Sequence, residues 1–195
     1  MSRTRLACCV TCATFAWSIT ACSSSDSAPA AGNAGATSAA GAGAVADGEP
    51  ADLAGITAEH NATRANVQPS ATPTIPPLTW SNSVASAAQA WANRCVFEHS
   101  QGQYGENIYA SGGQAAAGDK IVRSWVSEAQ DYDYESNACS NVCGHYTQVV
   151  WRKSLRLGCG VARCTKNSPF AGFPEWQFVV CNYDPPGNFN GQKPY

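Results

Sequence analysis

The sequence has few charged residues and no excess of basic ones. Charged side chains make up 13% of the 195 residues, and 12 lysines and arginines stand against 14 aspartates and glutamates. Domains that bind nucleic acid typically carry a basic surface, so the composition argues against a nucleic-acid partner. The apolar stretch near the N-terminus, residues 6–21, is also shorter than the roughly 20 residues that a transmembrane helix needs.

Two hydrolase motifs are missing as well. The sequence contains neither Gly-x-Ser-x-Gly, which presents a nucleophilic serine, nor His-Glu-x-x-His, which binds catalytic zinc. No nucleophile–base pair is evident elsewhere, and no group stands out as a partner for an oxyanion. We therefore expect a binding protein rather than an enzyme. If the chain is an enzyme, a metal-dependent hydrolase is the alternative.

The N-terminus is typical of an export signal. Residues 1–21 begin with a short basic segment and continue with the apolar stretch, and Cys22 follows directly. Small residues before a cysteine resemble the lipobox of bacterial lipoproteins, in which the signal peptide is removed and the cysteine is lipidated. We expect such a lipid anchor at Cys22. The alternative is an ordinary secretory signal, cut near Ala21 or after Ser23.

A linker and one domain follow the signal. Of the 29 residues at 23–51, 11 are alanine, 5 are serine and 5 are glycine. Such a composition cannot bury a hydrophobic core. We expect residues 22–51 to form a disordered tether that starts with the lipidated cysteine, and residues 52–195 to form a single domain.

The number of cysteines is consistent with disulfides. Three cysteines leave with the signal peptide, Cys22 is lipidated, and six remain in the domain. An even number suits three disulfides in an oxidising compartment, but spacing alone leaves fifteen pairings open. A zinc-binding protein is the alternative for these six, although they contain no tight Cys-x2-Cys pair. The six cysteines are Cys95, Cys139, Cys143, Cys159, Cys164 and Cys181.

Hydrophobic periodicity predicts helices first and strands last. We expect helices at 52–67, with Asp52 as a cap, at 81–95, with Ser81 or Asn82 as a cap, and at 114–130. Residues rich in valine, tyrosine and tryptophan predict strands at 145–151, 157–164 and 176–183. This order indicates an α+β fold with an antiparallel sheet covered by helices.

Four polar side chains on separate segments are candidates for a site. His99 and Glu106 lie in a predicted loop, Glu128 lies on the apolar face of the third helix, and His145 opens the first strand. Imidazole and carboxylate groups suit zinc or another divalent metal, but the same four residues suit a hydrogen-bonded polar cluster without metal. His60 lies on the apolar stripe of the first helix, where we expect a buried, structural histidine.

Four motifs resemble those of the CAP superfamily, also called the SCP domain family, which includes cysteine-rich secretory, antigen-five and pathogenesis-related group-one proteins. Gly144–Trp151 and Phe178–Tyr183 look like its two signatures. His60–Arg64 is similar to its HNxxR motif, in which His60, Asn61 and Arg64 are the named positions, and Gly105–Ile108 is similar to its GEN motif. The likeness is greatest to the plant pathogenesis-related proteins.

The resemblance implies a fold and a site. The fold is a three-layer α-β-α sandwich with a central antiparallel sheet. The family's cleft tetrad corresponds to the four candidate residues above, of which His99 and His145 would bind zinc or another divalent cation. The cysteine pairs of plant relatives map onto Cys95–Cys164, Cys139–Cys143 and Cys159–Cys181.

The expected function is ligand binding. We expect an exported monomer, held at the cell envelope by Cys22 or released outside the cell, whose cleft binds a sterol, another lipid or an unknown ligand. A defence or host-interaction protein that acts through surface loops is a further alternative. The C-terminal residues 185–195 fit a pattern that plant relatives release as a signalling peptide. We expect that segment to pack over the sheet as a tail, with release as a peptide the alternative.

Overall fold

A computed structural model gives the fold of residues 45–195. The predicted signal peptide, Cys22 and the linker as far as residue 44 lie outside these described residues. The elements are η1 Ala51–Leu53, α1 Ile56–Ala65, β1 Thr79–Trp80, α2 Asn82–Ala92, β2 Gly105–Gly112, α3 Gly118–Val126, η2 Ser127–Asp131, β3 Tyr132–Asp133, β4 Ala138–Cys139, α4 Gly144–Val149, β5 Arg156–Cys164 and β6 Trp176–Asp184. Among residues 45–195, no helix combines the length and the hydropathy that a membrane crossing requires.

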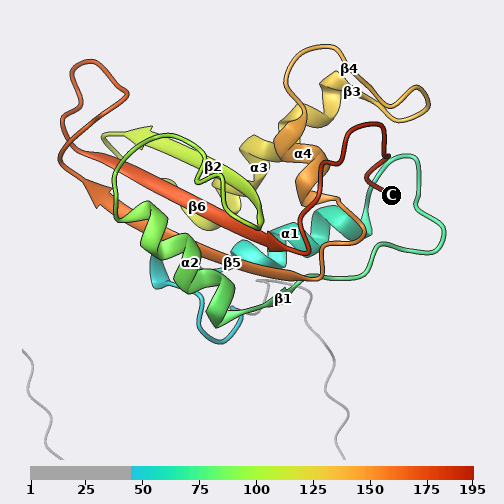
Figure 1. Cartoon of the computed structure of the whole chain (residues 1–195), viewed down its shortest axis with the longest axis horizontal. Coiled ribbons are helices and arrows are strands. Elements are labelled where there is room, and N and C mark those ends of the chain that lie inside the picture. Colours follow the sequence, from blue (N-terminus) through green and yellow to red (C-terminus); the bar gives the residue numbers. More distant parts are fainter. Residues whose placement is uncertain (1–44) are drawn as a thin grey trace, which may run out of the picture. The chain divides into compact units, whose positions relative to one another are not determined.

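A four-stranded sheet forms the centre, in the order β1-β5-β6-β2 (Figure 1). Strands β5, β6 and β2 pair antiparallel, as predicted, and the two-residue strand β1 adds a parallel edge beside β5. The strands at 157–164 and 176–183 are therefore confirmed as β5 and β6. Strand β2 was not predicted, because its glycines and polar residues resemble a loop.

Helices cover both faces of the sheet and make three layers. Side chains of β6 alternate between the two faces, as strand geometry requires. Phe178 and Val180 belong to the hydrophobic cluster on the α2 face, whereas Val179 and Cys181 belong to the cluster shared with α1, α3 and α4. Because both faces are buried, β6 is apolar over most of its length. The predicted α-β-α sandwich is confirmed.

Helix α2 packs directly against the backbone of β5. A Cβ atom added to Gly158 would lie 2.1 Å from the Ala85 nitrogen, and one added to Gly160 would lie 2.3 Å from Gln89 Cα. Only glycine permits this approach. At the start of the helix, Ser81 Oγ accepts from the Val84 N–H over 3.5 Å, so the predicted cap is present.

The predicted strand at 145–151 is wrong. Residues Gly144–Val149 form helix α4, although tyrosine, threonine and valine favour strands. Tyr146, Val149 and Val150 lie three and four residues apart and are all buried in the core. Helical spacing puts these side chains on one face, whereas a strand would turn Val149 to the face opposite Tyr146 and Val150. Burial of that face overrides the local preference.

Two other helices differ from their predictions in detail. Helix α1 is not capped by Asp52: Glu49 accepts from the N–H groups of Gly55 and Thr57 instead, over 2.9 and 3.0 Å. The predicted helix at 114–130 divides into α3 and the 3₁₀ turn η2. Glu128 therefore lies on η2, beyond the end of the α-helix.

The three disulfides have the pairing that the resemblance implied. Cys95–Cys164 ties the end of α2 to β5, and Cys159–Cys181 joins opposite positions on β5 and β6. Cys139–Cys143 closes a short loop before α4, rather than before a strand. The cysteines are thus structural.

The His60–Arg64 motif is a buried anchor for α1. Arg64 is 1% exposed and makes five hydrogen bonds of 2.8–2.9 Å to four backbone carbonyls, those of Pro76, Val149, Trp151 and Ser154. Asn61 exchanges two hydrogen bonds with the backbone of Leu78. Arg64 thereby holds the last turn of α4 against α1.

The C-terminal segment packs on α4 rather than over the sheet. The Asn188 amide donates to the Gly144 carbonyl over 2.7 Å, and Thr147 Oγ1 donates to Asn188 Oδ1 over 2.8 Å. The ring of Phe189 lies 6.1 Å from that of Trp151. The expectation of a tail over the sheet is therefore wrong, and release of residues 185–195 as a peptide stays an untested alternative.

Candidate functional site

His99 and Glu106 form the first of two histidine–glutamate pairs. His99 lies in the loop after α2, and Glu106 is the second residue of β2. His99 Nδ1 lies 2.8 Å from Glu106 Oε1, which also accepts from the Ser100 N–H over 2.9 Å. Because a carboxylate only accepts, Nδ1 carries the proton. The carboxylate side chain is 7% exposed and the imidazole 47%, so a buried acid holds an exposed ring.

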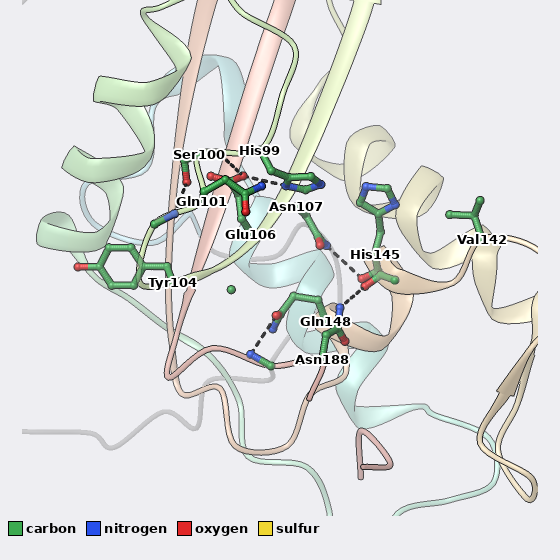
Figure 2. A pocket seen from close by; sticks show the side chains of 14 residues that line it. His99, Ser100, Gln101, Tyr104, Glu106, Asn107, Val142, His145, Gln148 and Asn188 are labelled. Atoms are coloured by element: carbon green, nitrogen blue, oxygen red, sulfur yellow. Dashed lines mark hydrogen bonds and ion pairs between the residues drawn. The ribbon is translucent and has the colours of Figure 1, made fainter. Parts of the chain in front are cut away.

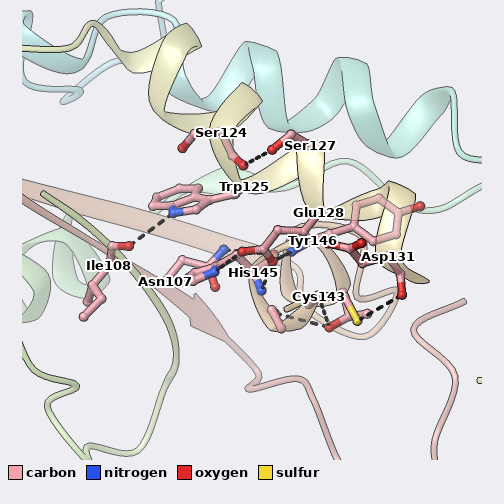
Figure 3. A network of polar contacts seen from close by, with 12 residues as sticks. Asn107, Ile108, Ser124, Trp125, Ser127, Glu128, Asp131, Cys143, His145 and Tyr146 are labelled. Atoms are coloured by element: carbon pink, nitrogen blue, oxygen red, sulfur yellow. Dashed lines mark hydrogen bonds and ion pairs between the residues drawn. The ribbon is translucent and has the colours of Figure 1, made fainter. Parts of the chain in front are cut away.

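His145 and Glu128 form the second pair (Figure 3). His145 is the second residue of α4, and its Nδ1 donates to Glu128 Oε1 over 2.6 Å. Glu128 Oε2 accepts from the His145 N–H over 2.9 Å, so one carboxylate both caps α4 and orients the ring. The imidazole also stacks on Trp125, with the ring planes 9° apart and the centroids 6.2 Å apart.

Three of the four predicted residues line one cavity of about 360 Å³ (Figure 2). They are His99, Glu106 and His145. Glu128 does not line it and acts on it through His145. The structure thus brings two imidazoles to one cavity, each held from behind by its own glutamate.

Sequence reasoning missed Asn107 and Gln148, which line the same cavity. Asn107 Nδ2 donates to the His145 carbonyl over 3.0 Å and to the Tyr183 hydroxyl over 3.1 Å. Both residues stand inside quoted motifs, but a strand at 145–151 would have turned His145 and Gln148 to opposite faces. In a helix, His145 and Gln148, which are three residues apart, lie on the same face.

The donor set fits a divalent metal bound by two imidazoles. With Nδ1 protonated and hydrogen-bonded to a carboxylate, Nε2 of each ring is the atom with a free lone pair, and within residues 45–195 neither Nε2 has a hydrogen-bond partner. Metal-binding histidines commonly have this carboxylate behind them. Glu106 Oε2 is buried and also has no partner in the described part of the chain. No group of three or more His, Cys, Asp or Glu residues gathers around a metal position there, so water or ligand atoms would complete the coordination shell.

Comparison with known proteins agrees with this fold. The model of the CAP family, described as the cysteine-rich secretory protein family, matches residues 57–183. Pathogenesis-related protein 1A of Nicotiana tabacum is 44% identical over 142 residues, which cover 70% of this chain and 76% of the relative. Pathogenesis-related protein 1 of Arabidopsis thaliana is 45% identical over 125 residues, covering 62% of this chain and 72% of the relative.

A protein with the same fold has been crystallised with zinc. The crystal structure of NaASP2 with Zn²⁺ superposes with a TM-score of 0.55 at 25% identity, covering 72% of this chain and 82% of the other. The three-layer α-β-α sandwich and the matched family model define the class of the protein as a CAP domain. The chain belongs to this family, and its relatives of known sequence include the plant pathogenesis-related group-one proteins.

Proposed function

We propose that this CAP domain binds a ligand in the cavity of Figure 2, with a divalent metal ion held by Nε2 of His99 and of His145. One observation carries the proposal: two imidazoles line one cavity, each with Nδ1 on a carboxylate and Nε2 without a partner among residues 45–195. Glu106 and Glu128 keep the proton on Nδ1, which leaves the Nε2 lone pairs for the metal.

The lining favours a ligand with oxygen or nitrogen donor atoms. A metal ion bound by His99 and His145 would act as a Lewis acid that anchors a carboxylate, hydroxyl or carbonyl oxygen of the ligand. Gln101, Asn107, Gln148 and Asn188 add amide groups to the same cavity, whereas Val142 is its one aliphatic side chain larger than alanine. A sterol or other lipid would place its polar head group beside these amides and the two imidazoles.

Binding without catalysis remains the favoured function over hydrolysis. The cavity residues include no serine or cysteine hydrogen-bonded to either histidine. Kinship with pathogenesis-related proteins is consistent with a role in defence or host interaction. The secretory description of the family and the three disulfides support export. We keep the lipid anchor at Cys22 as a proposal, which a Cys22→Ala variant tests by its release from the membrane fraction.

Calorimetric titration of the folded protein with zinc tests the metal site. We expect the wild type to bind and a His99→Ala/His145→Ala variant to lose at least 100-fold in affinity, because both ligands are gone. Equal zinc affinity of the two proteins would contradict the proposal. Turnover of peptides or esters that zinc stimulates and Glu106→Gln abolishes would instead favour the hydrolase.

A further inference from the structure

The two histidine–glutamate pairs belong to different parts of the fold. The first comes from the loop after α2 and from β2, and the second comes from α4 and η2. Within residues 45–195, no hydrogen bond joins one pair directly to the other. A metal ion shared by the two rings requires a defined separation between them, so other residues must set the distance between β2 and α4.

Among residues 45–195, β2 and α4 meet through the residues on either side of Glu106. Asn107 Nδ2 donates to the carbonyl of His145 over 3.0 Å. On the other side, Gly105 faces the amide of Gln148, which lies one helical turn after His145. The strand therefore touches the helix at the two positions that flank its glutamate.

The Gln148 side chain is among those that line the cavity (Figure 2), and both ends of its amide are hydrogen-bonded. It is 1% exposed, its Oε1 accepts from the Gly187 N–H over 3.1 Å, and its Nε2 donates to Ser154 Oγ over 3.1 Å. Ser154 Oγ in turn donates to the Pro185 carbonyl over 2.8 Å. An amide bonded at both ends cannot turn aside without leaving buried polar groups unpaired.

Gly105 leaves no space between the strand and this amide. A Cβ atom at residue 105 would lie 2.2 Å from Gln148 Oε1 and 2.8 Å from its Cδ. Real side chains do not approach this closely, so the backbone of β2 rests on the amide. The length of the glutamine side chain then determines how far β2 lies from α4 at this end of the sheet.

We propose that Gln148 is a positioning residue that sets the separation of the two imidazoles, with Asn107 as the second tie. The inference rests on the proposed metal site and goes further, because it assigns the geometry of that site to a residue that touches neither imidazole ring. The contact of a glycine with a buried amide is the observation that carries it.

A double-mutant cycle with zinc as the probe tests this role. Gln148→Ala removes the spacer, and Gly105→Ala pushes against it, so each single change should weaken zinc binding about tenfold. In the double variant the added methyl group meets no amide, and the loss should stay well below the 100-fold product of independent effects. Gln89→Ala is the matched control, because Gln89 makes two comparable hydrogen bonds to Val161 on the far face of the sheet.

The control separates positioning from stability. Gln89→Ala should lower the midpoint of thermal unfolding and leave the zinc affinity of the folded protein unchanged. If Gln148→Ala and Gly105→Ala behave in the same way, the inference is overturned. Crystal structures of metal-free wild type and Gly105→Ala give a readout that does not depend on zinc: the distance between the two Nε2 atoms should differ. An unchanged distance contradicts the inference, whereas a wild type that binds no zinc contradicts only the proposed function.

Discussion

Two polar clusters of this domain each contain histidine, and they differ in how completely their groups are paired. In the cluster of His60 and Arg64, both ring nitrogens of His60 are bonded, Nδ1 to the Ile56 carbonyl and Nε2 to the Tyr183 hydroxyl, each over 2.8 Å. In the cleft cluster of the two histidine–glutamate pairs, Nδ1 is the one ring nitrogen with a partner within residues 45–195. A fully paired group can only stabilise the fold, whereas a half-paired group at a cavity remains able to bind.

A chain of hydrogen bonds connects the two clusters. Because the Ile56 carbonyl accepts from His60 Nδ1, Nε2 is the acceptor and the Tyr183 hydroxyl donates to it. Tyr183 in turn accepts from Asn107, which donates to the carbonyl of His145. The structural cluster therefore supports the helix that carries one of the cleft histidines.

Replacing Arg64 should give the largest effect, and this effect should be on stability. Arg64→Met keeps the length of the side chain but leaves four buried carbonyls without their charged donor, which we expect to cost about 3–5 kcal/mol of unfolding free energy. Urea unfolding followed by circular dichroism measures it. Arg64→Lys is the control. It keeps the charge but cannot make all five hydrogen bonds, so its stability should lie between those of the wild type and Arg64→Met. A loss below about 1 kcal/mol would contradict the role of an anchor.

The second largest effect should be a loss of stability on acidification, which arises from His60. Burial, aided by the positive charge of Arg64, lowers the pKa of His60 from its ordinary 6.5 to about 4. Between these values the unfolded chain binds a proton that the folded chain does not, so stability is fully present above pH 6.5 and falls as the pH drops. From pH 7 to pH 5 we expect the free energy of unfolding to fall by about 2 kcal/mol.

Urea unfolding at the two pH values measures this loss, and His60→Gln supplies the control. Glutamine does not titrate, so the variant should lose about 2 kcal/mol less than the wild type over the same interval. Equal pH dependence in both proteins would show that the acid sensitivity arises elsewhere.

Changing a cleft glutamate should give the smallest effect, and it should act on zinc binding as well as on the cap of α4. Glu128→Gln keeps one oxygen for His145 Nδ1, but it places an NH2 group where Oε2 accepts from the His145 N–H and removes the negative charge that strengthens the ring as a ligand. We expect zinc affinity to fall about tenfold, the lower end of what such partners contribute. Calorimetry measures the affinity and urea unfolding the stability. A variant that binds zinc as well as the wild type would show that Glu128 only caps α4.

Much of this fold follows from local patterns of residues. The motifs at His60–Arg64, Gly105–Ile108, Gly144–Trp151 and Phe178–Tyr183 identify the family, and the matched family model confirms it. Strand β6 was predictable because a strand buried on both faces is apolar throughout. The disulfide pairing followed from the resemblance, since spacing alone left fifteen pairings open.

Other features depend on contacts between residues far apart in the chain. Helix α4 looks like a strand by composition, and burial of Tyr146, Val149 and Val150 together with the Arg64 hydrogen bonds overrides that preference. Strand β2 looks like a loop, and it becomes a strand because β6 supplies its partner. Neither outcome is visible in a window of ten residues.

The sequence by itself determined the family, the α+β class and the four candidate site residues, because motifs and burial patterns depend on residues that are close in the chain. Only the tertiary structure decided that His99 and His145 line one cavity, that Glu128 stands behind a ring rather than in the cavity, and that Gln148 lies between β2 and α4. Those distances arise from packing between elements, and packing depends on the whole fold.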